Sequence, residues 1–167
     1  MTTGQHRTLL VFWGGGTGAA LRYLISLWAP PAWAAGVPLA ILLINLAGAA
    51  GLGIVFVLAD EAGLLRAATR LTVAVGFLGG FTTWSTFMTG AVTLLHEGQL
   101  VIALLYLSLS LLGGPLAVTV GVAATRRVLA AGSRRLTHED LAAEIGSIEA
   151  EDREATGRAA GQQRDRR

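Results

Sequence analysis

Glycine and hydroxyl residues are unusually dense in one apolar stretch of the chain, residues 76–87. The stretch reads GFLGGFTTWSTF, with three glycines and four hydroxyl side chains. Each glycine lowers helix stability by up to about 1 kcal/mol, so the cluster predicts a break in a helix. Carbonyl groups freed at a break suit a hard cation such as Na⁺, whereas hydroxyl donors and aromatic ring edges suit an anion. A flexible packing site of small residues is the alternative, but the density of the cluster favours an ion-related break.

Few other polar side chains interrupt the apolar segments. Asn45 can donate its amide to an anion or bond a neighbouring helix, and Arg22 can attract anions or extend to the membrane surface. Tyr106, Ser110 and Gly114 share one helix face, so hydroxyls could line a water-filled path, although serine also bonds back to helix carbonyls. No Asp, Glu or His lies in an apolar segment, which argues against a proton relay.

Four segments are long and apolar enough to span a membrane, which takes about 20 residues each. They are Thr8–Ala29, Val37–Ala59, Leu71–Leu95 and Gln99–Thr125. We therefore expect an all-α membrane protein with four transmembrane helices, the third broken in mid-membrane. The short connection His96–Gly98 predicts an antiparallel hairpin of the last two helices, while Pro30–Gly36 forms the first turn. Gly14 and Gly18 have the spacing that allows close helix approach.

The charge distribution separates a channel-like domain from a tail. The chain of 167 residues is 53% hydrophobic and 14% charged, and residues 126–167 hold most of the charges. We expect a transmembrane domain over residues 1–125 and a charged, partly disordered cytoplasmic tail over 126–167, with a short helix starting near Thr137. Acids interleave with the arginines of the tail, so no basic stripe for nucleic acid is present. The absence of cysteine excludes thiol chemistry and disulfides.

The arginines also predict an orientation. With four spans, both termini and the second loop lie on one side, and this side holds Arg7, Arg66, Arg70, Arg126, Arg127, Arg134 and Arg135. The loops on the other side hold no basic residue. The positive-inside rule therefore predicts a multi-pass protein of the plasma membrane with both termini in the cytoplasm.

Three motifs resemble the CrcB/Fluc family of fluoride channels: GGGTGAALRY at 14–23, NLAG at 45–48 and the stretch at 76–87. The resemblance covers roughly residues 8–125 and excludes the tail. It implies a passive, fluoride-specific channel that lets cytoplasmic fluoride leak out, and not an enzyme. It also implies an antiparallel dimer of bundles with two pores and a structural Na⁺ at the dimer interface.

The resemblance assigns roles residue by residue. Backbone carbonyls of Gly79 and Thr82 would hold the sodium, and Arg22 would lie in the vestibule. The fluoride pore would contain Asn45, Thr83, Trp84, Ser85, Thr86, Phe87, Tyr106 and Ser110. Two positions depart from the family pattern, because Trp84 replaces a usual Phe and Gly114 stands where a further Ser often occurs.

Two other functions fit the size and hydropathy of the chain. A small multidrug-resistance-type exporter would need a carboxylate in the first span, which holds Arg22 and no acid. A non-conducting structural subunit would leave the hydroxyl-rich break unexplained. The charge bias further predicts one fixed orientation, so it favours a paralogous partner of opposite topology over an antiparallel homodimer.

Overall fold

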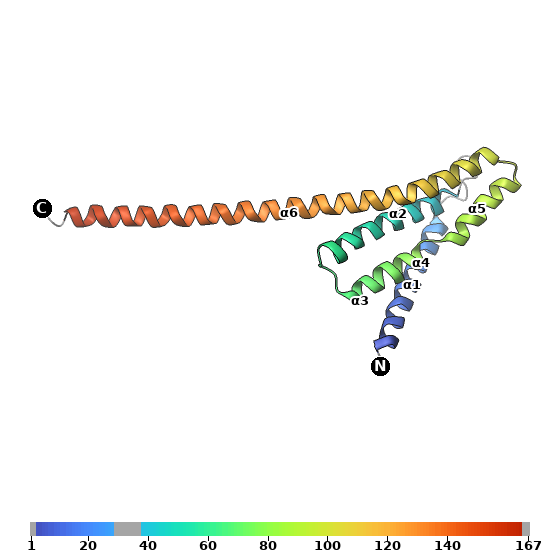
Figure 1. The fold of residues 1–167 in the computed structure, drawn as a ribbon, viewed down its shortest axis with the longest axis horizontal. Coiled ribbons are helices and arrows are strands. Elements are labelled where there is room, and N and C mark those ends of the chain that lie inside the picture. The colour runs from blue at the N-terminus through green and yellow to red at the C-terminus, as the bar shows by residue number, and fades with distance from the viewer. Residues whose placement is uncertain (1–2, 29–37, 165–167) are drawn as a thin grey trace. The chain divides into compact units, whose positions relative to one another are not determined.

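The computed structural model describes the backbone of residues 3–28 and 38–164, and the side chains of residues 4–28 and 38–132. The predicted turn Pro30–Gly36 lies outside the described residues. Every regular element in these ranges is helical (Figure 1), including two π-helical stretches, η1 and η2. In chain order the elements are α1 (Thr3–Trp28), α2 (Leu39–Phe56), η1 (Val57–Glu61), α3 (Ala67–Arg70), η2 (Leu71–Leu78), α4 (Gly79–Phe81), α5 (Trp84–His96) and α6 (Leu100–Arg164).

Three helical stretches of the described chain are long and apolar enough to cross a membrane. They are Leu39–Glu61, Ala67–His96 and Leu100–Gly132. Their bounds lie within a few residues of the second and third predicted spans and of the start of the fourth. Helix α1 has sufficient length, at 26 residues, but its glycines and Arg22 lower its mean hydropathy below that of the other three.

Helix α1 packs closely against η2 and α4 because glycines face each other across the contact. A Cβ atom at Gly18 would lie 2.9 Å from the Phe81 nitrogen and would overlap the Phe77 carbonyl oxygen. A Cβ at Gly14 would lie 3.1 Å from the Gly76 Cα. The two glycines that the sequence placed at close-approach spacing therefore do bring two backbones together.

A second glycine contact joins α2 to the first part of α6, and the two helices run side by side in Figure 1. A Cβ at Gly53 would lie 3.0 Å from the Val122 nitrogen, and one at Gly121 would lie 3.0 Å from the Ala50 carbonyl carbon. Any larger side chain at either position would push the helices apart.

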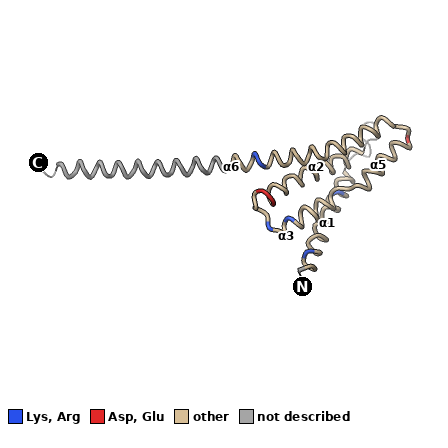
Figure 2. Tube along the Cα trace, in the orientation of Figure 1, with Lys and Arg blue, Asp and Glu red and all other residues tan. Residues whose placement is uncertain are grey.

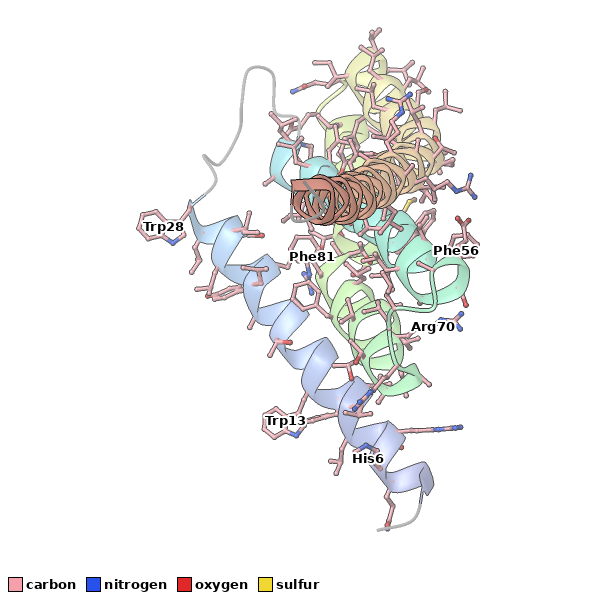
Figure 3. The ribbon with its side chains drawn as sticks, turned by 90° about the vertical axis from the view of Figure 1, so that its left-hand side faces the viewer. His6, Trp13, Trp28, Phe56, Arg70 and Phe81 are labelled. Carbon is pink, nitrogen blue, oxygen red and sulfur yellow. The ribbon has the colours of Figure 1, made fainter. Side chains whose placement is uncertain are left out.

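Apolar side chains from α2, α4, α5 and α6 form the core. Its buried members are Ile41, Leu42, Ile44, Phe81, Phe87, Ala91, Leu94, Ala103 and Tyr106. Figure 3 shows Phe81 directed toward the other helices, whereas Trp13 and Trp28 on α1 point outward. Trp13 is 66% exposed and Trp28 is 87% exposed. Large apolar side chains are also exposed along α2, α5 and α6, as expected where lipid or another chain covers a helix.

The turn between α5 and α6 has the tight geometry that the three-residue connection predicted. Gly98 has a positive φ of 74°, a conformation that glycine adopts without steric cost. Its N–H donates to the Leu95 carbonyl at 3.1 Å, and the Gln99 N–H donates to the Leu94 carbonyl at 2.9 Å. The turn reverses the chain, so α5 and α6 form a helical hairpin.

Helix α6 continues from the fourth apolar segment into the tail. Its backbone is helical from Leu100 to Arg164, without a new helix start near Thr137. The residues after Arg126 are rich in Ala, Arg and Glu, which favour helix, and no proline follows Pro115. The chain divides into two compact units, Met1–Arg126 and Arg127–Arg167.

Figure 2 marks the charged residues of the first unit along the Cα trace, with acidic positions at the end of η1 and basic positions in and after the loop that follows it. Arg70 pairs with Asp60 at 3.0 Å. Arg126 binds Glu61 through both sides of its guanidinium group, with Nε donating to Oε2 at 2.8 Å. These pairs join η1 to α3 and to α6.

Candidate functional site

Two residues in extended conformation separate α4 from α5. Thr82 has φ −76° and ψ 157°, and Thr83 has φ −147° and ψ 125°. The interruption lies inside the glycine- and hydroxyl-rich stretch, where the sequence predicted a break. Thr83 also starts the next helix, because its Oγ1 accepts the Thr86 N–H at 3.3 Å, as an N-cap residue does.

The interruption redirects the hydrogen bonds that a continuous helix would make. The Leu78 carbonyl accepts from both the N–H and the hydroxyl of Thr82, at 3.0 and 2.9 Å. The next helical bond would run from the Thr83 N–H to the Gly79 carbonyl, but this N–H donates to Asn45 instead. The Thr86 N–H likewise donates to the Thr83 side chain rather than to the Thr82 carbonyl. Gly79 and Thr82 thus lose their i+4 donors.

Asn45 on α2 pairs with the backbone of Thr83. Its Oδ1 accepts the Thr83 N–H at 2.9 Å, and its Nδ2 donates to the Thr83 carbonyl at 3.0 Å. The sequence left open whether this amide binds a neighbouring helix or an anion, and the structure shows the bonds to the neighbouring segment. One N–H of the amide takes no part in this pairing.

Arg22 on α1 reaches α4, the short helix before the interruption. Its Nε donates to the Gly80 carbonyl at 3.3 Å, across the close contact between α1 and α4. The side chain is half-buried. Its positively charged guanidinium group therefore lies at the carbonyl of Gly80, the residue that directly follows Gly79.

A pocket of about 390 Å³ opens beside the interruption, and both residues proposed to hold a cation line it. The lining residues are Asn45, Gly48, Ala49, Leu52, Ala74, Leu78, Gly79, Thr82, Thr83 and Trp84. A Cβ at Gly79 would meet no atom within 4 Å, so no neighbouring helix or side chain fills the space next to its Cα. Carbonyl oxygens without helical donors beside an open pocket fit a hard cation such as Na⁺. Among the described residues, no cluster of His, Cys, Asp or Glu offers a different metal site.

Hydroxyl groups cluster at the start of α5. The Thr83 hydroxyl donates to the Thr86 Oγ1 at 3.1 Å and lies 3.4 Å from the Ser85 Oγ. Ser85 and Thr86 are exposed in this chain. Three of the predicted pore hydroxyls are therefore brought together at one point.

Aromatic rings connect this cluster to α6. The Trp84 and Phe87 ring centroids lie 5.3 Å apart, and those of Phe87 and Tyr106 lie 5.2 Å apart. Phe87 and Tyr106 are buried, whereas Trp84 is 68% exposed. Ser110 follows Tyr106 by one helical turn. The Tyr106 Oη and the Ser110 Oγ are both buried atoms without a hydrogen-bond partner among the described residues.

Two contacts have partners that the sequence did not identify. One is the hydrogen bond from Arg22 to the Gly80 carbonyl, and the other is the pair of hydrogen bonds between the Asn45 side chain and the Thr83 backbone. Each joins residues at least 38 positions apart, so no local pattern signals it. All the residues in these two contacts lie in the three sequence motifs at 14–23, 45–48 and 76–87.

Three apolar helices long enough to cross a membrane, with two extended residues between α4 and α5, define a multi-pass helical membrane protein. The family described as "CrcB-like protein, Camphor Resistance (CrcB)" matches residues 9–122. The chain belongs to this family.

Several curated relatives cover most of the same region. The fluoride-specific ion channel FluC of Chlorobium chlorochromatii (strain CaD3) is 41% identical over 118 residues, which are 71% of this chain and 91% of that protein. FluC 2 of Nocardia farcinica is 40% identical over 128 residues, or 75% and 89% of the two chains. FluC 1 of Streptomyces coelicolor is 40% identical over 116 residues, or 70% and 75%.

Proposed function

We propose that this protein is a fluoride-specific ion channel, not an enzyme, and that it passively lets fluoride leave the cytoplasm. Relatives about 40% identical are named fluoride-specific ion channels, and their alignments with this chain cover most of the length of each relative. The structural observation that carries the proposal is the pair of buried hydroxyl oxygens of Tyr106 and Ser110, which have no hydrogen-bond partner among the described residues. Buried polar groups almost always have a partner, and a permeating ion would provide one.

The chemistry of these groups suits a small anion. Fluoride holds its water tightly, so a channel must replace that water with hydrogen-bond donors. The hydroxyls of Tyr106 and Ser110 and the remaining N–H of Asn45 are donors, and Thr83, Ser85 and Thr86 add further hydroxyls near the interruption. The positive edges of the Phe87 and Trp84 rings complete the path. Neutral donors of this kind bind an anion more weakly than a charged side chain would, so the anion can leave again.

We further propose four membrane spans, with α1 as the first and the Thr82–Thr83 interruption in mid-membrane. Helix α1 is 26 residues long, and its glycine contacts join it tightly to the third span. Irregular backbone inside a membrane survives only where protein or water covers it, and Asn45, Arg22 and the pocket supply that cover. Residues 1–125 would form the channel domain of a plasma-membrane protein.

A sodium ion is proposed for the carbonyls of Gly79 and Thr82. The loss of their helical donors and their position on one pocket support this assignment. Two carbonyl oxygens are too few for the complete coordination shell of a sodium ion. The second chain of an antiparallel dimer would therefore contribute two carbonyl oxygens of its own. When bound, the ion would supply a fixed positive charge near the pore donors.

The arginine bias supports a proposal about the partner. Arg7, Arg66, Arg70, Arg126 and their neighbours favour one orientation, with both termini in the cytoplasm. An antiparallel dimer then requires a related chain of opposite bias rather than a second copy of this one. The relatives from Nocardia and Streptomyces carry the numbers 2 and 1 in their names, which agrees with more than one such chain in a cell.

Fluoride efflux from proteoliposomes tests the function. We expect rapid fluoride efflux, no chloride efflux and no proton-coupled transport of a cationic drug. Drug transport would instead support an exporter, and the absence of any flux with every partner would support a structural subunit.

The proposal about the partner is tested with two separate reconstitutions in the same efflux assay. The chain is reconstituted alone and together with a paralogue of opposite charge bias. We expect conduction only from the mixture. Robust conduction by this chain alone, or equal populations of reporter tags on both membrane sides, would contradict the fixed orientation.

A further inference from the structure

The side chain of Asn45 competes with the Gly79 carbonyl for one donor. In a continuous helix the Thr83 N–H would donate to Gly79, four residues earlier. In the structure it donates to the Asn45 Oδ1 at 2.9 Å. The two acceptors therefore correspond to two alternative backbones, one helical through Thr83 and one interrupted there.

The hydrogen bonds with Asn45 stabilise the interrupted backbone, because they give partners to both the N–H and the carbonyl group of Thr83. The Asn45 Nδ2 also donates to the Thr83 carbonyl at 3.0 Å, which fixes the peptide groups on both sides of Thr83. Buried backbone groups need partners, so an extended residue between two helices is stable only where other groups supply them. Asn45 is half-buried and lines the same pocket as Gly79 and Thr83.

We propose that Asn45 is a positioning residue: it holds Thr83 extended and thereby keeps the Gly79 carbonyl oxygen free for a cation. This inference rests on the proposed function, since it gives that cation a place in the channel. Cation binding at Gly79 and the pairing at Thr83 then favour each other, because a carbonyl that binds the cation no longer accepts from Thr83. Such coupling is reciprocal, so sodium should stabilise the pairing as the pairing promotes sodium binding.

Two substitutions and one control separate this role from that of a simple pore ligand. Asn45→Leu keeps the approximate size of the side chain and removes both hydrogen bonds. Asn45→Asp keeps an acceptor for the Thr83 N–H in either protonation state. Tyr106→Phe is the control, because it removes a proposed pore donor and leaves the Thr83 pairing intact.

The experiment measures hydrogen exchange at the Thr83 amide, and thermal stability in sodium chloride compared with choline chloride, on the assembled protein. We expect roughly tenfold faster exchange in Asn45→Leu, corresponding to one lost hydrogen bond, together with loss of the sodium-dependent stabilisation. Asn45→Asp should restore slow exchange. Tyr106→Phe should keep both properties of the wild type while its fluoride efflux falls.

The outcomes distinguish this inference from the proposed function. If wild-type protein conducts fluoride but Asn45→Leu retains slow Thr83 exchange and sodium stabilisation, the positioning role is wrong and the channel function stands. If Asn45→Leu does not assemble, hydrogen exchange at the Thr83 amide is compared in the wild type and in Asn45→Asp. Fast exchange in both of these proteins would overturn the inference. Absence of fluoride flux in the wild type contradicts the function, whatever the exchange data show.

Discussion

The contact between α1 and α4 gives the strongest structural prediction, because a single added methyl group cannot fit there. A Cβ at Gly18 would lie 2.9 Å from the Phe81 nitrogen and closer still to the Phe77 carbonyl oxygen. Both partners are backbone atoms, which cannot rotate away as a side chain can. Ordinary contacts between carbon and a carbonyl oxygen are about 3.3–3.6 Å, so Gly18→Ala forces the helices apart by on the order of 1 Å.

Gly16→Ala is the matched control on the same helix. A Cβ at Gly16 meets nothing within 4 Å. Both variants gain up to about 1 kcal/mol from the better helix propensity of alanine, so that gain cancels when they are compared. Overpacking typically costs about 1–3 kcal/mol, and we expect Gly18→Ala to be less stable than Gly16→Ala by that amount.

Reversible unfolding in mixed detergent micelles measures this difference, and fluoride efflux measures its functional effect. Displacement of α1 also lengthens the 3.3 Å bond from Arg22 to the Gly80 carbonyl, so efflux should fall in Gly18→Ala and not in Gly16→Ala. Equal stability of the two variants, within about 0.5 kcal/mol, would refute the close packing of these helices.

Three further predictions concern the pore and the helix ends. Tyr106→Phe should slow fluoride efflux several-fold without loss of thermal stability, because the hydroxyl has no partner to lose; a lower melting temperature would contradict this. Trp84→Phe should leave folding unchanged, since Trp84 is 68% exposed, and should speed efflux through the smaller ring while chloride stays excluded; chloride leakage in flux assays would count against the ring-edge path. Glu61→Gln should lower the melting temperature slightly at low salt and not at high salt, because an exposed pair with Arg126 is screened; a loss that salt does not change would show another role for Glu61.

Hydropathy and composition predicted much of the helical framework. The second and third apolar segments, the start of the fourth and the turn at Gly98 were found within a few residues, because length and apolarity determine them locally. The extended residues Thr82 and Thr83 lie in the stretch where three glycines and four hydroxyl residues disfavour a regular helix, while a break of the third span in mid-membrane stays a prediction.

The contacts that organise the interruption could not be predicted in the same way. Asn45 and Thr83 are 38 residues apart, and Arg22 and Gly80 are 58 apart, so their bonds depend on how whole helices pack. The backbone of the tail is helical to Arg164, and its alanine and glutamate content favours a helix, while the expected partial disorder of the tail stays a prediction. The roles of the pore hydroxyls stay predictions that flux measurements must test.

The interruption at Thr82 and Thr83 also has an electrostatic consequence. The helical run Ala67–Phe81 ends there with its carbonyl groups, and α5 begins there with its N–H groups. Helix dipoles give the first end a partial negative charge and the second a partial positive charge. A single two-residue gap thus presents fields of opposite sign a few ångströms apart, one suited to a resident cation and one to a passing anion. A continuous helix would cancel both fields in its interior.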